Sequence, residues 1–192
     1  MSITVKNLYK AFDSKIIFEN FSFNFDDNKI YLIEGESGIG KITLLRILSG
    51  LDTSYRGEVL GGGLENCAFM FQEYRLFPTI SALENVLLSR PKDERNIDEA
   101  KALLFRLGFT DEEIYLLPDM LSGGMKGRVS FARALYSQRP ILLLDEPTKE
   151  LDSSNADTML QIIKEESENK TIILVSHTKI DHILDMVVKI KL

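Results

Sequence analysis

The sequence has few of the features that mark secreted or membrane-spanning proteins. Only Cys67 of its 192 residues is a cysteine, so the chain cannot form an internal disulfide and an oxidising compartment is not implied. The longest apolar runs, such as residues 141–144 and 172–175, are far too short to cross a bilayer. Polar and charged residues interrupt the first part of the chain, where a signal peptide would need a continuous apolar segment. We therefore expect a cytoplasmic globular protein.

Acidic residues outnumber basic ones. The chain carries 23 lysines and arginines against 29 acidic residues, a net charge of −6 at pH 7. This balance argues against a broad surface for nucleic acid or for an anionic membrane. A length of 192 residues with 44% hydrophobic content is enough to bury a real core. Since repeats, low-complexity tracts and linkers are absent, we expect residues 1–192 to form a single domain.

Hydrophobic periodicity predicts alternating strands and helices. Residues 3–8 alternate between apolar and polar, and the phenylalanines within residues 21–25 fall at period two, as in half-buried strands. Further strands are predicted by short apolar runs at residues 30–33, 68–71, 141–144, 171–175 and 187–192. One face of a helix is predicted by the spacing of Leu44, Ile47, Leu48 and Leu51.

Residues 78–138 differ from the rest of the chain and are mainly helical in pattern. Within them, Ala100, Leu103, Leu104 and Leu107 share one helix face. Thr110 and Glu113 have the spacing of a capping box, which predicts that another helix begins there. The sequence thus predicts an α/β core interrupted by a helical insert.

A glycine-rich loop comes directly after the predicted strand at residues 30–33. Its residues are Gly35, Glu36, Ser37, Gly38, Ile39, Gly40, Lys41, Ile42 and Thr43. Glycines allow backbone N–H groups to curl around phosphate oxygens, while Lys41 and the N-terminus of the following helix add positive charge. A strand, this loop and a helix in that order predict a phosphate-binding P-loop.

One position of the loop departs from the usual pattern. A serine or threonine normally follows the lysine, because its hydroxyl ligates Mg²⁺. Ile42 has no oxygen to offer a metal. The hydroxyl of Thr43 is one residue further on, about 100° around the helix, so it does not simply substitute. The loop therefore indicates phosphate binding more strongly than hydrolysis.

Two consecutive carboxylates, Asp145 and Glu146, end the apolar run at residues 141–144. In such a position Asp145 can hold Mg²⁺ through water, and Glu146 can polarise an attacking water molecule. Acidic residues are common at the ends of strands, so this pair alone is a weak signal. Together with the P-loop it predicts a nucleotide site.

Taken together, these motifs resemble one family, the nucleotide-binding subunits of ATP-binding cassette (ABC) transporters, over essentially the whole chain. The P-loop resembles the Walker A motif, and residues 141–146 resemble Walker B. Residues 121–125, which alone would be an ordinary helix cap, resemble the signature motif. The other family motifs are matched by residues 71–73 (Q-loop), 151–152 (D-loop) and 175–177 (switch histidine).

The resemblance implies a role for each matching residue. Glu146 would be the catalytic carboxylate, and Gln72 would hold Mg²⁺ together with Asp145. His177 would contact the γ-phosphate of ATP. Phe12 occupies the position of an aromatic that stacks on adenine, although the residues alone explain it equally well as a core aromatic.

The resemblance also implies an architecture and partners. The chain would have a RecA-like P-loop core, a helical subdomain at about residues 74–138 and a small N-terminal antiparallel β region. Two subunits, identical or different, would enclose two ATP molecules head to tail. Each ATP would lie between one P-loop and the signature motif of the other subunit. The signature and D-loop residues concerned are Ser122, Gly123, Gly124 and Asp152.

Such a subunit would lie at the inner face of the cell membrane and power a separate transmembrane permease, with an extracytoplasmic solute-binding protein as a further partner. Residues 124–129 are most like importers of the nitrate, sulfonate and taurine type. Two other functions stay open. Ile42 permits an ATP-binding switch with little turnover. A soluble ABC-type ATPase of translation or DNA repair fits less well, because those generally carry two cassettes or long coiled-coil inserts.

Overall fold

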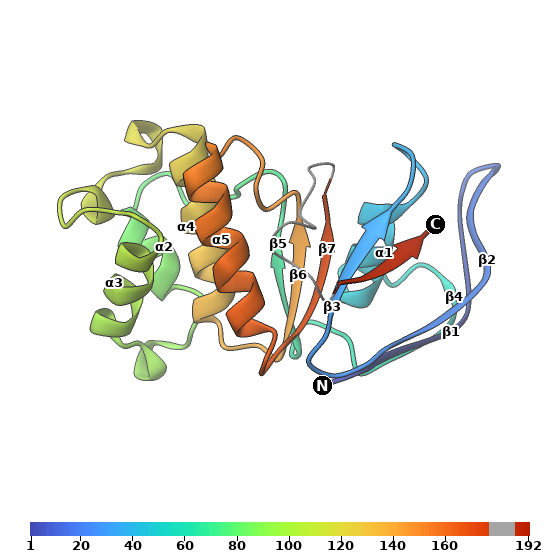
Figure 1. The fold of residues 1–192 in the computed structure, drawn as a ribbon. Helices are drawn as coiled ribbons and strands as arrows, with labels where there is room; N and C mark the ends of the chain where they lie inside the picture. The colour runs from blue at the N-terminus through green and yellow to red at the C-terminus, as the bar shows by residue number, and fades with distance from the viewer. Residues whose placement is uncertain (177–186) are drawn as a thin grey trace.

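The structure, a computed structural model, describes residues 1–176 and 187–192 (Figure 1). Its strands are β1 (Ile3–Phe12), β2 (Lys15–Phe25), β3 (Ile30–Glu34), β4 (Arg56–Leu60), β5 (Cys67–Met70), β6 (Ile141–Asp145), β7 (Thr171–Val175) and β8 (Val187–Lys191). Its α-helices are α1 (Lys41–Leu48), α2 (Ala82–Leu87), α3 (Ile97–Arg106), α4 (Gly123–Tyr136) and α5 (Ser153–Glu166). Short 3-10 turns occupy Lys92–Glu94, Glu113–Tyr115 and Pro118–Met120.

The strands form two sheets. Five parallel strands have the order β5-β6-β7-β3-β8, and β2-β1-β4 form a separate antiparallel sheet. Because parallel strands end at the same edge, the loops that follow β3, β5 and β6 meet there. In Figure 1, helices α2 to α5 cover one side of the parallel sheet, and α1 lies on the other side with the antiparallel sheet.

The alternation of side chains along each strand divides the core in two. Leu142 and Leu144 of β6 pack toward the helical layer, whereas Ile141 and Leu143 pack toward α1 and the antiparallel sheet. All four side chains are fully buried. A continuous apolar run is therefore what a central parallel strand with both faces covered requires. The predicted α/β core and its helical insert are present, and the division at about residues 74–138 stays a prediction.

The structure corrects three details of the sequence analysis. Helix α1 ends at Leu48, and Leu51 is 42% exposed because the chain turns back so that its N–H donates to the carbonyl of Arg46. The capping box of Thr110 and Glu113 forms, but only the 3-10 turn at Glu113–Tyr115 follows it. Strand β4 was not predicted.

Among residues 1–176 and 187–192, no helix combines the length and apolar character needed to span a bilayer.

Candidate functional site

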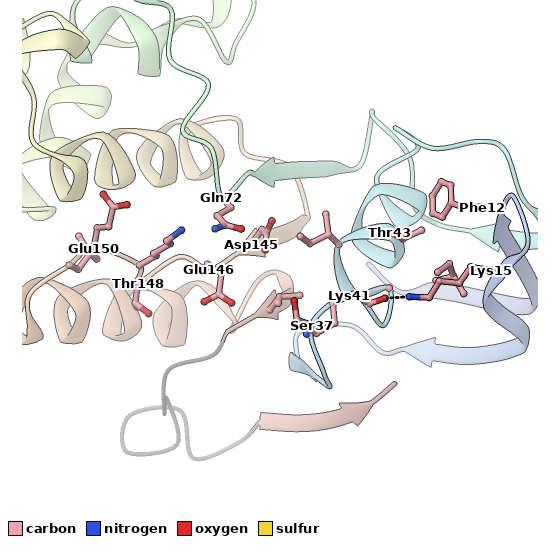
Figure 2. Close-up of a pocket in the computed structure, with 17 residues that line it drawn as sticks. Phe12, Lys15, Ser37, Lys41, Thr43, Gln72, Asp145, Glu146, Thr148 and Glu150 are labelled. Atoms are coloured by element: carbon pink, nitrogen blue, oxygen red, sulfur yellow. Dashed lines mark hydrogen bonds between the residues drawn. The ribbon is translucent and has the colours of Figure 1, made fainter.

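A cleft of about 910 Å³ lies where the loops after β3, β5 and β6 meet the turn between β1 and β2 (Figure 2). Its lining residues include Phe12, Lys15, Ile17, Ser37, Gly38, Gly40, Lys41, Ile42, Thr43, Gln72, Asp145, Glu146, Thr148, Lys149, Glu150 and Leu151. The cleft thus collects, in one place, side chains that are more than one hundred residues apart in the sequence.

The P-loop wraps around the ammonium group of Lys41. This buried side chain donates hydrogen bonds to the carbonyl oxygens of Gly35, at 2.7 Å, and Glu36, at 2.9 Å. Gly40 closes the loop with a φ of 120°, and a Cβ there would approach Ile17 to 2.4 Å. Only glycine fits such a position. The loop therefore fixes a positive charge beside the N-terminus of α1, where phosphate is favoured.

Not every predicted loop residue faces the cleft. Six of the nine line it: Ser37, Gly38, Gly40, Lys41, Ile42 and Thr43. Gly35, Glu36 and Ile39 complete the turn behind it without being lining residues. Ile42 is 43% exposed at the position where the pattern expects a hydroxyl, and the side chain of Thr43 reaches the same cleft from the next position.

The two predicted carboxylates both reach the cleft, in different environments. Asp145 is only 4% exposed, so burial raises the pKa of its carboxyl, and the charge of Glu146 raises it further. Glu146 is half-buried, with a φ of 52°, and its N–H donates to the carbonyl of Val175 at 2.9 Å. This left-handed conformation costs about 1 kcal/mol. It turns the chain away from β6 and leaves Glu146 at the cleft.

Gln72 completes the group of polar side chains at this edge. It lies just beyond β5, and Figure 2 shows it next to Asp145. Its backbone N–H bonds the Asp145 carboxyl, which opposes the upward shift of that pKa. A carboxylate and an amide oxygen suit Mg²⁺, which usually takes one or two protein oxygens besides phosphates and water. Among the described residues, no cluster of three or more histidines, cysteines or acidic residues could hold a metal ion.

Phe12 lies at the opposite end of the cleft, at the end of β1 (Figure 2). The ring is 50% exposed, so the alternative that it is a core aromatic is wrong. Lys15, at the start of β2, donates to the carbonyl of Gly38 at 3.2 Å and also lines the cleft. Lys15 was not predicted from the sequence, because a lysine at the start of a strand carries no motif.

The signature residues and Asp152 lie outside the cleft, whereas the other D-loop residue, Leu151, lines it. Ser122 caps α4 by accepting a 3.2 Å hydrogen bond from the N–H of Met125. Asp152 caps α5 by accepting from the N–H of Asn155 at 2.9 Å. In the described part of the chain, neither these caps nor the two signature glycines line the cleft. His177 lies outside the described residues.

Comparison with known proteins shows the family of this chain. Residues 18–149 match the family described as ABC transporter. The chain belongs to this family. As an ABC transporter ATP-binding domain, it has the RecA-like P-loop fold that the sequence predicts. A dimeric ABC cassette in a post-hydrolysis state, bound to ADP and phosphate, has a TM-score of 0.84 with this chain at 28% identity. That likeness covers 98% of this chain and 94% of the other.

Curated relatives are also ABC ATP-binding proteins. An uncharacterized ABC transporter ATP-binding protein of Methanocaldococcus jannaschii is 36% identical over 91% of this chain and 88% of its own length. The L-cystine import ATP-binding protein TcyC of Bacillus subtilis is 34% identical over 91% of this chain and 80% of its own length. The aliphatic sulfonates import ATP-binding protein SsuB 2 of Pseudomonas fluorescens is 36% identical, over 91% and 67% respectively.

Proposed function

We propose that this ABC protein is the ATP-hydrolysing subunit of a transporter and powers a separate membrane permease. The observation that supports this most strongly is the composition of the cleft. It combines the P-loop lysine, Lys41, with the acidic pair Asp145 and Glu146 and with Gln72. A phosphate cradle facing two carboxylates is the arrangement that phosphoryl transfer to water requires.

The cleft would bind ATP along its length. Phe12 would stack on the adenine at one end, and the P-loop amides with Lys41 would hold the phosphates in the middle. Asp145 and Gln72 would hold Mg²⁺, which neutralises charge on the phosphates when bound. Since Ile42 supplies no hydroxyl, these two residues would be the protein's main ligands.

Glu146 would act on the water that attacks the γ-phosphorus. Its carboxylate would accept a proton from this water as the new oxygen–phosphorus bond forms. The bond between the γ-phosphorus and the bridging oxygen breaks, and ADP leaves with the electron pair of that bond. His177 would contact the γ-phosphate, as the family resemblance implies.

Two copies of the chain would complete each site. Ser122, Gly123 and Gly124 lie at the N-terminus of α4, which offers backbone N–H groups to an anion, and they do not line their own chain's cleft. A second copy placed head to tail would bring this N-terminus to the γ-phosphate, with Asp152 at the same interface. The match to an aliphatic sulfonates importer, together with residues 124–129, supports an importer of that type. Its partners would be a permease at the inner face of the membrane and a solute-binding protein.

An ATP-binding switch is the second candidate, and one observation favours it. Ile42 places an apolar side chain, 43% exposed, in the cleft where a metal-ligating hydroxyl is usual. A site that binds phosphate but coordinates Mg²⁺ poorly would bind ATP and dimerise with little turnover.

Mg²⁺-dependent ATP turnover tests the proposal. We expect Glu146→Gln to lower turnover about 10²–10⁴-fold, because it removes the general base. Glu19→Gln, an exposed position on β2 outside the cleft, should leave turnover unchanged. Ile42→Thr then separates the two candidates. If the native chain already hydrolyses ATP and the variant gains little, the ATPase proposal stands; if only the variant turns over, the chain is a switch.

A further inference from the structure

Lys10 contacts the ring of Phe12 from outside the cleft. The two residues lie on β1, two positions apart, yet Lys10 is 4% exposed and Phe12 is 50% exposed. The Nζ atom of Lys10 lies over the Phe12 ring, 4.6 Å from its centroid. Phe12 lines the cleft, whereas Lys10 does not. The ammonium group therefore occupies one face of the ring and leaves the other face for a base.

The same ammonium group is held by the segment that follows α1. It lies 2.9 Å from Oδ1 and 2.7 Å from Oδ2 of Asp52, and it donates to the carbonyl of Ser54 at 2.8 Å. Burial alone would raise the pKa of Asp52, but the hydrogen bonds from Lys10 and from the N–H of Ser54 lower it overall. Asp52 is thus ionised at neutral pH, and the buried lysine is paired.

Asp52 is itself fixed to the helix that carries the P-loop. Its N–H donates to the carbonyl of Arg46, in the last turn of α1, at 3.0 Å. Lys41 stands at the first position of the same helix. A chain of direct contacts therefore runs from the Phe12 ring through Lys10 and Asp52 to the helix that holds the phosphate-binding lysine.

We propose that Lys10 is a positioning residue for nucleotide binding. Its ion pair with Asp52 and its contact with the ring hold Phe12 at a fixed place relative to the P-loop, so that base and triphosphate of one nucleotide fit together. This inference rests on the proposed stacking of Phe12 on adenine. An exposed ring at the end of a strand otherwise loses rotamer freedom on binding, and a ring already in place avoids that cost.

The inference predicts a selective loss of affinity. Removing Lys10 should lower the affinity for nucleotides that carry a base and leave the affinity for a ligand made of phosphates alone unchanged. If the buried ion pair only supported the fold, its loss would lower the affinity for both ligands to the same extent.

Calorimetric titration with Mg²⁺-ATP and with inorganic tripolyphosphate tests this. Lys10→Met keeps most of the side-chain length without the charge. We expect it to lower the affinity for ATP at least about fivefold, the low end of the contribution of base stacking on an aromatic ring, and to leave the affinity for tripolyphosphate unchanged. Phe12→Ala should lower the affinity for ATP at least as much, and the double variant should lose no more affinity than Phe12→Ala alone. Lys6→Met, on the same strand but with a side chain 56% exposed, serves as the matched control.

The outcomes separate the inference from the proposed function. If Phe12→Ala leaves ATP affinity unchanged, the stacking role fails and the role of Lys10 fails with it. If Phe12→Ala lowers the affinity for ATP but Lys10→Met does not, only the role of Lys10 is overturned. An equal loss of affinity for ATP and for tripolyphosphate in Lys10→Met also overturns it. If Lys10→Met does not fold, Asp52→Asn is the second variant, and the same selective loss of ATP affinity is expected.

Discussion

The hydroxyl of Tyr74 donates a 2.8 Å hydrogen bond to the carboxylate of Glu150, joining the segment after Gln72 to the segment after Glu146. The same carboxylate packs against the signature motif, because a Cβ added at Gly123 would lie 2.0 Å from its Oε2. Burial raises the pKa of Tyr74 to about 12, and the neighbouring carboxylate contributes. The hydrogen-bonded pair therefore joins the segments that follow Gln72 and Glu146, and it packs against the signature motif.

The raised pKa predicts how stability changes in alkaline solution. The folded protein favours the protonated hydroxyl, so the stability that Tyr74 contributes is complete below its ordinary pKa of 10 and is lost as the pH rises toward about 12. We expect the denaturant midpoint to fall more steeply above about pH 10 in the native protein than in Tyr74→Phe. Parallel curves for the two proteins would contradict this assignment.

Gly123→Ala should break the same hydrogen bond from the other side. The new methyl group would lie on the Glu150 carboxylate, which must move away from Tyr74. The variant should therefore show the shallower alkaline fall of Tyr74→Phe. Gly127→Ala, in the same helix, is the matched control because its Cβ would contact the Tyr74 ring at an ordinary 3.4 Å. It should keep the native alkaline curve and gain up to about 1 kcal/mol in unfolding free energy.

Asp145→Asn should stabilise the nucleotide-free protein while abolishing its turnover. Burial and the charge of Glu146 raise the pKa of Asp145 in the folded protein. The stability that its protonated form contributes is therefore complete below the ordinary pKa and is lost as the pH rises through the pKa of the folded state. The raised pKa therefore opposes folding at neutral pH, and replacing the carboxyl with an uncharged amide should raise the unfolding free energy. Denaturant unfolding near pH 7, repeated at acidic pH, checks this: the gain should shrink in acid. A variant less stable than the native protein at pH 7 would refute it.

Cys67 should be inert in the folded protein. Burial raises the pKa of its thiol to about 12, and its Sγ lies 3.6 Å from the carbonyl oxygen of Leu48. The thiolate is the reactive form, so a maleimide or iodoacetamide reagent should label Cys67 only after denaturation. Mass spectrometry of native and unfolded samples measures this, and rapid labelling of the native protein would show that the site opens.

The fold was predictable where the signal is local. Apolar runs at residues 141–144 and 171–175 predict central strands because burial on both faces demands them. Strand β4 gave no such signal, because four of its five residues are exposed and only Val59 is half-buried. Its pairing with β1 depends on backbone hydrogen bonds. The early end of α1 was missed because Leu51 keeps the helical spacing beyond the last helical turn.

The candidate site was predictable only as far as short motifs reach. Lys41 and Asp145 were found because their chemistry depends on neighbours in sequence. Lys10 was missed because its partner, Asp52, lies 42 residues away, and no spacing rule relates them. Glu150 was missed for the same reason, since its contact with Tyr74 spans 76 residues.

ATP turnover per subunit, measured with Mg²⁺ over a wide range of protein concentration, tests most directly whether two copies complete each site. Turnover per subunit should rise with concentration and level off once the proposed dimer is formed, because Ser122 and Gly124 would reach the ATP of the other subunit only in that dimer. A constant turnover per subunit at every concentration would contradict this, since a single chain would then contain the whole site. No turnover at any concentration, in the native chain and in Ile42→Thr alike, would contradict hydrolysis itself.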